Sequence, residues 1–291
     1  MPEIGVVHLV RAKNGPEPLQ RFLESYTKHS AGIDHDLIIV FKGFPEKRLT
    51  VPYNQLLQPF PYKSLYVVDT GFDIRPYIIA SKFFDYKYFC FLNSFSVILD
   101  HDWLLKMYRF ISKEGIGLVG ATGSYQSPYT DVLNYLRERK SIPFYKKMFM
   151  VTYSKWMKLL FDPFPNYHIR TNAFMISSED IRRIRCRFIK MKFDAWRFES
   201  GKAALTKQIM RMNKRVLVVG KDGKGYEKED WYRSNTFWQA NQDNLLVADN
   251  QTNKYLNGDV GTQRQLNRFA WGDKVYNITE LCSNTRHKSD S

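Results

Sequence analysis

Short apolar runs alternate with segments of helical periodicity along the first half of this chain, and no other feature constrains the fold as strongly. After the first run, Leu19, Phe22, Leu23 and Tyr26 recur at the spacing of one helix face. A strand, a helix and a second strand in this order form a parallel unit with a right-handed connection. The runs with the length and composition of buried strands are Ile4–Val10, Asp36–Phe41, Leu65–Val68, Tyr88–Leu92 and Gly117–Ala121.

This alternation predicts an α/β fold with a doubly wound, mostly parallel sheet and helices on both faces. Pro76–Phe84 is expected to form the helix between the third and fourth strands. Later strands are expected at Ile169–Ile176, Arg215–Val219 and Leu245–Val247, and later helices at Ser178–Ile184, with Ser178 as N-cap, and at Ser200–Met212.

The formal net charge of +15, from 44 Lys and Arg against 29 Asp and Glu, predicts an anionic partner. A nucleotide diphosphate, an anionic membrane surface and nucleic acid all meet this condition. The sequence has no zinc-finger spacing, no RNA-recognition motif and no uninterrupted basic helix, which weighs against nucleic acid.

Residues 125–165 mix basic with large apolar side chains, as in Tyr145–Val151 and Trp156–Phe161. A helix of this kind can lie in a membrane interface, where aromatic residues enter the headgroup region and lysines meet anionic lipid. It can also pack its aromatic face on the sheet and leave its lysines in water. We favour the packed helix, because aromatic stripes at helical spacing usually belong to a core.

The three cysteines, Cys90, Cys186 and Cys282, lie far apart and form no Cys-x-x-Cys pair, which favours a reducing compartment. The first residues lead directly into a strand-like run without a basic and then apolar leader. A run of about 18 consecutive apolar residues, as a membrane span needs, does not occur. We therefore expect a cytoplasmic protein, with peripheral attachment to a membrane as an open alternative.

Polar loops follow the third and fourth strands, with Asp69–Pro76 after one and Asn93–Ser96 after the other. In open α/β sheets, ligands bind in the crevice beyond the carboxyl ends of the strands. Asp69, Asp73 and Asn93 are therefore candidate ligand-binding residues, although turn formation and helix capping would also account for the two aspartates.

From the third strand on, the chain is expected to form a strand, an Asp-containing loop, a helix, a strand, a short polar motif and the segment Trp103–Lys106. This order resembles the nucleotide-sugar half of GT-A glycosyltransferases of the family 2 type. The resemblance extends from Ile4 to Gly225 in the order of elements. In that family the fourth strand ends in an Asp-x-Asp motif that holds a divalent metal, Mg²⁺ or Mn²⁺, on the donor diphosphate. The matching positions here are Asn93, Ser94 and Phe95.

The resemblance also implies a division of the chain. Residues 1–225 would form the GT-A-like catalytic domain, with 125–165 as a helical insertion. Residues 226–291 would form a C-terminal extension packed on that domain, with a flexible tail at 284–291.

For the donor, the resemblance implies that loops after the first and third strands hold the nucleoside. Arg11 and Lys13 follow the first strand, and Asp69 and Asp73 follow the third. A solvated loop would account equally well for the two basic residues. A guanidinium grips phosphate bidentately, which makes Arg170 the preferred cation for the departing diphosphate.

Near the diphosphate, Asn93, Ser94 and Ser96 offer neutral oxygens only. Three explanations stay open for this altered motif. Lysine or arginine could replace the metal, acids elsewhere could help to hold Mn²⁺ or Mg²⁺, or the chain could have lost catalysis.

For proton transfer, Glu199 is expected immediately before a helix, at a place that resembles the base position of inverting GT-A enzymes. A helix N-terminus there would lower its pKa, and helix capping is the alternative role. Asp194 is the second candidate for the base. His168 and Asn172 are expected close to the donor or acceptor, and Asp222 or Lys221 is expected to close over the donor.

The resemblance thus implies a glycosyltransferase of polysaccharide biosynthesis that moves a sugar from a nucleotide-diphosphate donor to a glycan or lipid-linked glycan, with inversion and Glu199 as the base. The alternatives are a catalytically inactive GT-A-like protein that binds a nucleotide or glycan, and a basic protein that binds a nucleic acid or membrane surface through charge alone.

Overall fold

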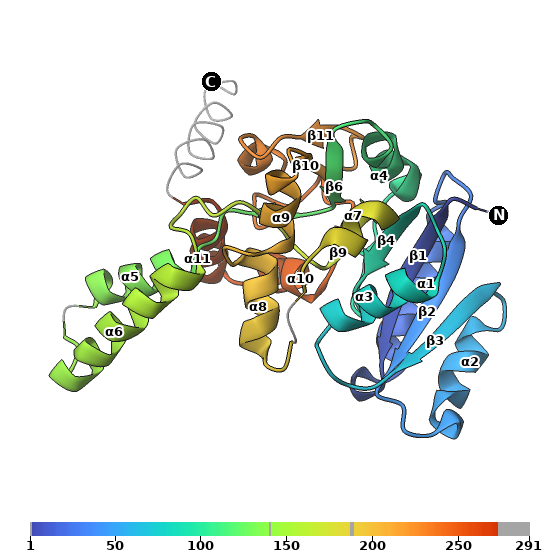
Figure 1. Cartoon of the computed structure of the whole chain (residues 1–291), viewed down its shortest axis with the longest axis horizontal. Coiled ribbons are helices and arrows are strands. Elements are labelled where there is room, and N and C mark those ends of the chain that lie inside the picture. Colours follow the sequence, from blue (N-terminus) through green and yellow to red (C-terminus); the bar gives the residue numbers. More distant parts are fainter. Residues whose placement is uncertain (1, 140, 187–188, 273–291) are drawn as a thin grey trace, which may run out of the picture.

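An eight-stranded mixed sheet forms the centre of the computed structural model, which describes residues 2–139, 141–186 and 189–272 (Figure 1). The strand order is β11-β10-β6-β9-β4-β1-β2-β3. Strand β9 runs antiparallel to both of its neighbours, and the short β11 runs antiparallel to β10, while the other pairs are parallel. The strands are β1 (Ile4–Arg11), β2 (Asp36–Lys42), β3 (Tyr62–Val67), β4 (Tyr88–Leu92), β6 (Ile116–Gly120), β9 (Ala173–Ser177), β10 (Arg215–Val219) and β11 (Gly225–Tyr226).

Helices cover both faces of the sheet. Successive side chains along a strand point to opposite faces, so each strand contributes to two buried clusters. In β1, Val6 and Val10 belong to one buried cluster, whereas Val7 and Leu9 belong to the other. The first cluster includes side chains of α1 (Glu17–Lys28), α2 (Val51–Leu57) and α4 (Trp103–Ile111). The second includes side chains of α3 (Ile74–Phe83), α7 (Ser178–Arg183) and α9 (Leu205–Arg211). The predicted α/β class, with a doubly wound, mostly parallel sheet and helices on both faces, is confirmed.

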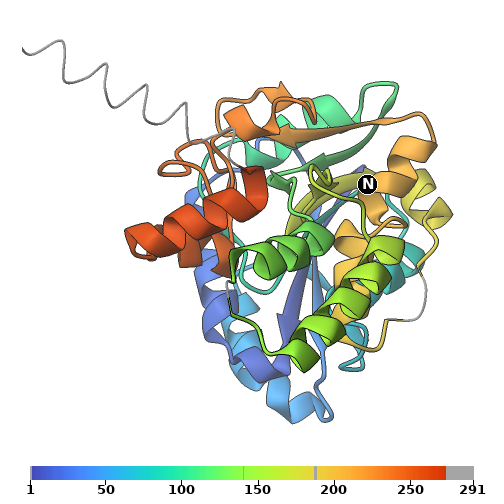
Figure 2. The ribbon, with the colours of Figure 1, turned by 90° about the vertical axis from the view of Figure 1, so that its left-hand side faces the viewer.

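The remaining elements lie outside the eight-stranded sheet. Helices α5 (Pro128–Glu138) and α6 (Phe144–Leu160) project from the body, and Figure 2 shows them beside α11 (Val260–Trp271). Short strands form two pairs, β5 with β12 and β7 with β8. The other elements are β5 (Val97–Ile98), β7 (Gly123–Ser124), β8 (His168–Ile169), β12 (Val247–Ala248), α8 (Lys192–Ser200), α10 (Asn250–Leu256) and the 3₁₀ turns η1 (Ala12–Asn14), η2 (Lys47–Thr50) and η3 (Trp231–Arg233).

The five strands predicted in the first half of the chain are confirmed, with differences of a few residues at their ends. The run predicted at Ile169–Ile176 divides into β8 and β9, because a bend at residues 170–172 separates them. The helix predicted at Ser200–Met212 is wrong at its start, since α8 ends at Ser200 and α9 begins at Leu205.

Two further expectations are corrected, and two lie outside the described residues. The N-cap of α7 is Ser177 rather than Ser178, because the Ser177 hydroxyl accepts the N–H of Asp180 at 3.0 Å. The expectation that α6 packs its aromatic face on the sheet is wrong, since only Ser154 and Met157 of this helix are buried. Cys282 and the tail at 284–291 lie outside the described part of the chain.

His8, on β1, is buried without any hydrogen-bond partner for either ring nitrogen, and its ring stacks on Phe22 with 3.8 Å between centroids. Burial lowers the pKa of His8 from 6.5 to about 3. The unfolded chain therefore binds one more proton than the folded protein between these two pH values, so stability rises with pH across this window.

We predict that His8→Leu makes the free energy of unfolding less dependent on pH. The slope between pH 6.5 and about 3 should fall by about 1.4 kcal/mol per pH unit, because this one titration is removed. Urea unfolding of both proteins at several pH values measures the slope. Equal slopes for the two proteins would show that His8 does not titrate on unfolding.

Candidate active site

A cavity of about 640 Å³ lies at the edge of the sheet where β4 and β6 end. Because β9 is antiparallel to these strands, the bend that precedes it reaches the same edge, and the Asn93 N–H donates to the Asn172 carbonyl at 2.8 Å. The walls therefore combine loops from distant parts of the sequence. They include Asp73, Ser124, His168, Arg170, Glu199 and Trp238.

Glu199 lines this cavity from the last turn of α8. Its Oε1 accepts the N–H of Thr171 at 3.0 Å. Burial raises the pKa of Glu199, and the nearby Asp249 carboxylate raises it further, while the charge of Arg170 and the bond from Thr171 act in the opposite direction. The expectations that Glu199 precedes a helix and that a helix N-terminus lowers its pKa are therefore wrong. A carboxyl group with a raised pKa in a cavity is suited to accept a proton.

Arg170 is buried in the bend between β8 and β9, where it joins three parts of the chain. Its Nη2 donates to Asp249 Oδ2 at 2.8 Å, and Nη1 lies 3.4 Å from the hydroxyl oxygen of Thr122. The guanidinium carbon lies 4.2 Å from the ring centroid of Phe237. The other oxygen of the buried Asp249 accepts the backbone N–H groups of residues 251 and 252 and thereby caps α10.

A second group of charges lies where β1, β2 and β3 end. Arg11 grips Asp69 with two hydrogen bonds, each of 3.0 Å. The Nζ atoms of Lys13 and Lys42 each lie 3.4 Å from an Asp69 oxygen. Burial alone would raise the pKa of Asp69, but the hydrogen bond and charge of Arg11, together with Lys42, lower it. Three cations thus surround one carboxylate.

Asp73 connects the two groups of charges. It lines the cavity and occupies the N-cap position of α3 without a side-chain capping bond. Burial raises the pKa of Asp73; Lys42 and Arg11 oppose this shift, whereas Glu199 and Asp249 add to it. Asp73 therefore lies within electrostatic range of both groups of charges.

The segment Asn93–Ser96, at which the resemblance would place an Asp-x-Asp motif, is a closed turn. The Oδ1 atom of Asn93 accepts the backbone N–H of Phe95 at 2.9 Å and the hydroxyl of Ser96 at 3.2 Å, and Asn93, Ser94 and Ser96 are all buried. Across 2–139, 141–186 and 189–272, no three His, Cys, Asp or Glu side chains are arranged to hold a metal ion. The turn offers neutral oxygens only, and Asn93 Oδ1 already accepts two hydrogen bonds within it, so these residues do not fit a divalent metal on their own.

His168 and Asn172 lie beside Arg170. The His168 Nδ1–H donates to the carbonyl of Asn166 at 2.8 Å, which leaves Nε2 as the acceptor of the neutral ring. Burial lowers the pKa of His168 to about 4, so the ring is neutral at pH 7. The Oδ1 atom of Asn172 accepts the hydroxyl of Thr122 at 2.7 Å, which ties the bend to the end of β6.

Asp194 and Asp222 do not line this cavity. The Asp194 carboxylate accepts the N–H groups of Lys190 and Met191, both at 3.0 Å, and so caps α8. The Asp222 carboxylate accepts the hydroxyl of Tyr226 at 2.7 Å within the connection between β10 and β11. The structure therefore does not bring these two acids together with Glu199.

Lys42 and Asp249 are charged residues of the site that the sequence analysis missed. Lys42 ends an apolar strand and is fully buried, with Nζ 2.6 Å from the carbonyl of Phe72. A charged residue at the end of an apolar strand can be recognised in the sequence as a candidate site residue. Asp249 followed by Thr252 has the spacing of a helix cap, but nothing local indicates its partner Arg170, which lies 79 residues away.

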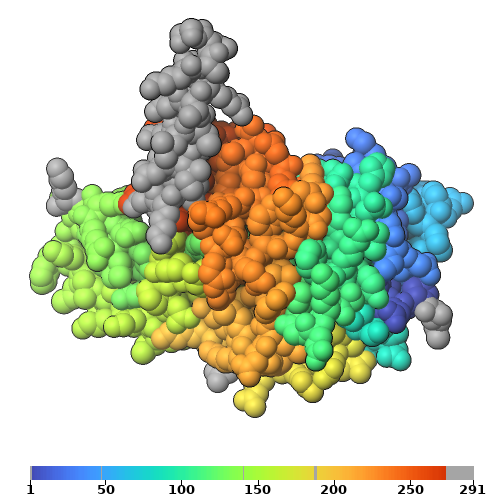
Figure 3. Space-filling view, turned by 90° about the horizontal axis from the view of Figure 1, so that it is seen from above, coloured from blue at the N-terminus to red at the C-terminus, as the bar shows by residue number. Residues whose placement is uncertain are grey.

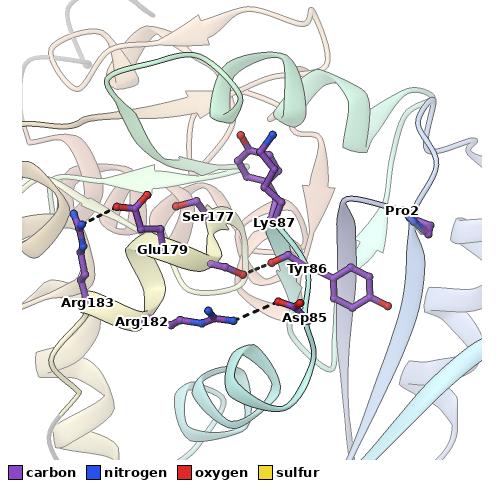
Figure 4. A pocket seen from close by; sticks show the side chains of 10 residues that line it. Pro2, Asp85, Tyr86, Lys87, Ser177, Glu179, Arg182 and Arg183 are labelled. Carbon is purple, nitrogen blue, oxygen red and sulfur yellow. Dashed lines mark hydrogen bonds and ion pairs between the residues drawn. The ribbon is translucent and has the colours of Figure 1, made fainter.

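A second hollow, of about 790 Å³, lies at the opposite edge of the sheet, beside the start of β4 and the end of β9 (Figure 4). Its walls carry the ion pairs Arg182–Asp85 at 3.7 Å and Arg183–Glu179 at 2.7 Å. These side chains are mostly exposed and already paired. The cavity at Glu199, by contrast, contains the buried guanidinium of Arg170.

Several solved structures show a remote likeness to this chain, each at 15% identity or less. No protein-family model and no curated protein matches this sequence. The chain is similar in structure to the mannosyltransferase PcManGT from Pyrobaculum calidifontis in complex with GDP-Man and Mn²⁺, at 11% identity and a TM-score of 0.48, over 81% of this chain and 60% of that one. It is also similar to S. aureus TarS 1-349 (13% identity, TM-score 0.44, 92% of this chain and 70% of that one) and to mouse xyloside xylosyltransferase 1 in its apo form (11% identity, TM-score 0.41, 74% and 84%).

We predict that Arg170→Met lowers the free energy of unfolding by about 3–5 kcal/mol, because it leaves the Asp249 carboxylate buried without its charged partner. Adding Asp249→Asn should recover at least half of this loss, since asparagine keeps the oxygen that caps α10. Urea unfolding of the two single variants and the double variant measures the coupling. Additive effects would contradict a buried pair of this kind.

Proposed function

We propose that this protein is a glycosyltransferase that moves a sugar from a nucleotide-diphosphate donor to a hydroxyl group of a glycan or lipid-linked glycan. The proposal rests on the surroundings of Glu199. A carboxyl group with a raised pKa shares one cavity with a buried guanidinium, beside a cationic group at the ends of parallel strands. This combination meets the needs of sugar transfer from a diphosphate.

In the proposed reaction, the acceptor oxygen attacks the anomeric carbon of the donor sugar. The bond from that carbon to the diphosphate oxygen breaks, and the nucleoside diphosphate leaves with the electron pair. Glu199 takes the proton of the attacking hydroxyl group, and the configuration is inverted because attack and departure occur on opposite sides. The raised pKa of Glu199 makes its carboxylate a stronger base than an exposed glutamate.

The donor nucleotide is proposed to bind at the ends of β1 to β3, with its diphosphate toward Arg170. Lys13 is largely exposed and within reach of the loop that holds Asp69. Arg11 and Lys42 add positive charge there, although Asp69 already binds both. Cations in such a position stabilise the negative charge that develops on a departing diphosphate. Whether Mg²⁺ or Mn²⁺ contributes is decided by measuring binding with and without chelator.

The sugar is proposed to lie against the aromatic wall of the cavity. Phe193, Trp196 and Trp238 line it on the side of α8 and α10. Apolar and aromatic walls with a few placed polar groups are typical of small-molecule sites. The neutral His168 and the amide of Gln251 offer hydrogen bonds to sugar hydroxyl groups at the same wall.

We predict that Glu199→Gln lowers the rate of transfer at least about a hundredfold, because the base is lost. Nucleotide binding should stay within about twofold, since the amide oxygen can still accept the N–H of Thr171. Release of nucleoside diphosphate in the presence of acceptor measures the rate. The matched control is Glu179→Gln on α7, which alters an exposed glutamate far from the cavity and should change neither quantity.

The pH dependence of the wild-type enzyme provides a second readout of the same prediction. The base must be deprotonated, so kcat/KM should fall as the pH decreases, with a midpoint above 4.5, the ordinary value for this side chain. Full turnover by the Glu199→Gln variant would remove Glu199 from the role of base. Donor binding without turnover in the wild-type protein would instead support a nucleotide-binding protein that lacks catalysis.

A further inference from the structure

Helix α6 lies at one end of the molecule (Figures 1 and 3). It exposes an unusual amount of apolar surface. Among the described residues, seventeen large hydrophobic side chains are exposed, and seven of them lie on this one helix. Phe144 is 80% exposed and Leu159 is 71% exposed. The other five are Tyr145, Met148, Phe149, Val151 and Trp156. An apolar patch of this density on a protein surface indicates an interaction site.

The same helix carries positive charge only. Its sequence contains four lysines and neither aspartate nor glutamate. The lysines are all exposed, and none takes part in the ion pairs found in the described part of the chain. They are Lys146, Lys147, Lys155 and Lys158. The partner of this surface must therefore accept apolar side chains and offer negative charge at the same place.

We propose that α6 docks on the surface of an anionic lipid bilayer. Phe144, Phe149 and Leu159 would enter the boundary between headgroups and acyl chains, and the lysines would lie among the lipid phosphates. Each lysine near an anionic surface adds attraction that salt weakens. Among the described residues, no helix is both long enough and apolar enough to span a membrane.

A lipid surface fits these observations better than a second copy of the chain. Two copies paired through α6 would bring eight lysines together, and the helix offers no carboxylate to neutralise them. The whole chain has a formal net charge of +15, which adds repulsion between copies. A bilayer with anionic headgroups removes both difficulties, because it supplies the negative charge and the apolar layer together.

The docking helix lies directly beside the cavity. Trp156 of α6 stacks on Phe193, with 4.9 Å between the ring centroids and an angle of 18° between the planes. Phe193 lines the cavity that contains Glu199. If the proposed transfer is correct, docking would present the cavity to acceptors held in the membrane, which favours lipid-linked glycans. The docking itself does not rest on that reaction.

Vesicle sedimentation tests the proposal without any nucleotide or sugar. The wild-type protein should bind vesicles that contain phosphatidylglycerol, bind less at high salt, and bind weakly to vesicles of phosphatidylcholine alone. The variant F144S/F149S and the variant K146Q/K147Q/K155Q/K158Q should each bind at least about tenfold more weakly. All replaced side chains are exposed, so folding should be retained, and thermal unfolding checks this.

Matched control variants replace similar side chains away from α6. F83S/V260S removes two apolar groups that are 66% and 64% exposed, and K28Q/K82Q/K113Q/K254Q removes four exposed lysines. These controls should bind vesicles as the wild-type protein does. The proposal is overturned if the wild-type protein does not bind phosphatidylglycerol vesicles, or if the α6 variants bind as well as the controls. It is equally overturned if α6 variants convert a dimer to a monomer and vesicle binding is absent.

Discussion

The buried guanidinium of Arg170 holds the candidate active site together. It binds the Asp249 carboxylate, stacks on Phe237 and approaches Thr122, so one side chain fixes the bend before β9, the start of α10 and the end of β6. Because the bend is fixed, the N–H of Thr171 meets Glu199 on α8. A buried ion pair contributes little net stability compared with apolar packing, but the loss of one partner is costly. The pair therefore acts mainly to fix the positions of the segments that surround the cavity.

The antiparallel strand β9 explains why these groups meet at one edge of the sheet. All of its neighbours end where β9 begins, so the bend before it reaches the loops that follow β4 and β6. Charged side chains lie along this edge in two groups. Arg11 and Lys42 surround Asp69 at one end, Arg170 balances Asp249 at the other, and Asp73 responds to both. A donor with a negative diphosphate and a neutral sugar matches this arrangement.

The sequence predicts the sheet well and the environment of the site poorly. Each strand is a local apolar run, so Ile4–Val10 or Tyr88–Leu92 can be recognised without its neighbours. The environment of Glu199 depends on where α8 ends and on Asp249, which lies fifty residues further along the chain. The pattern of α6 is the same for a core helix and an interfacial helix, and only its position at the end of the molecule distinguishes them. Long-range contacts decide all of these points.

We expect the polar edge of the sheet to bind a nucleotide-diphosphate sugar. The test is the melting temperature of the purified protein with a panel of nucleoside diphosphates and nucleotide sugars, each with EDTA and with Mn²⁺. A ligand that binds the folded state raises this temperature. We expect one nucleotide and its sugar conjugates to stabilise the protein selectively, and the two metal conditions to show whether the closed turn at Asn93 works without a metal. The absence of any shift, with every compound under both conditions, would show that this edge of the sheet does not bind a nucleotide-diphosphate sugar.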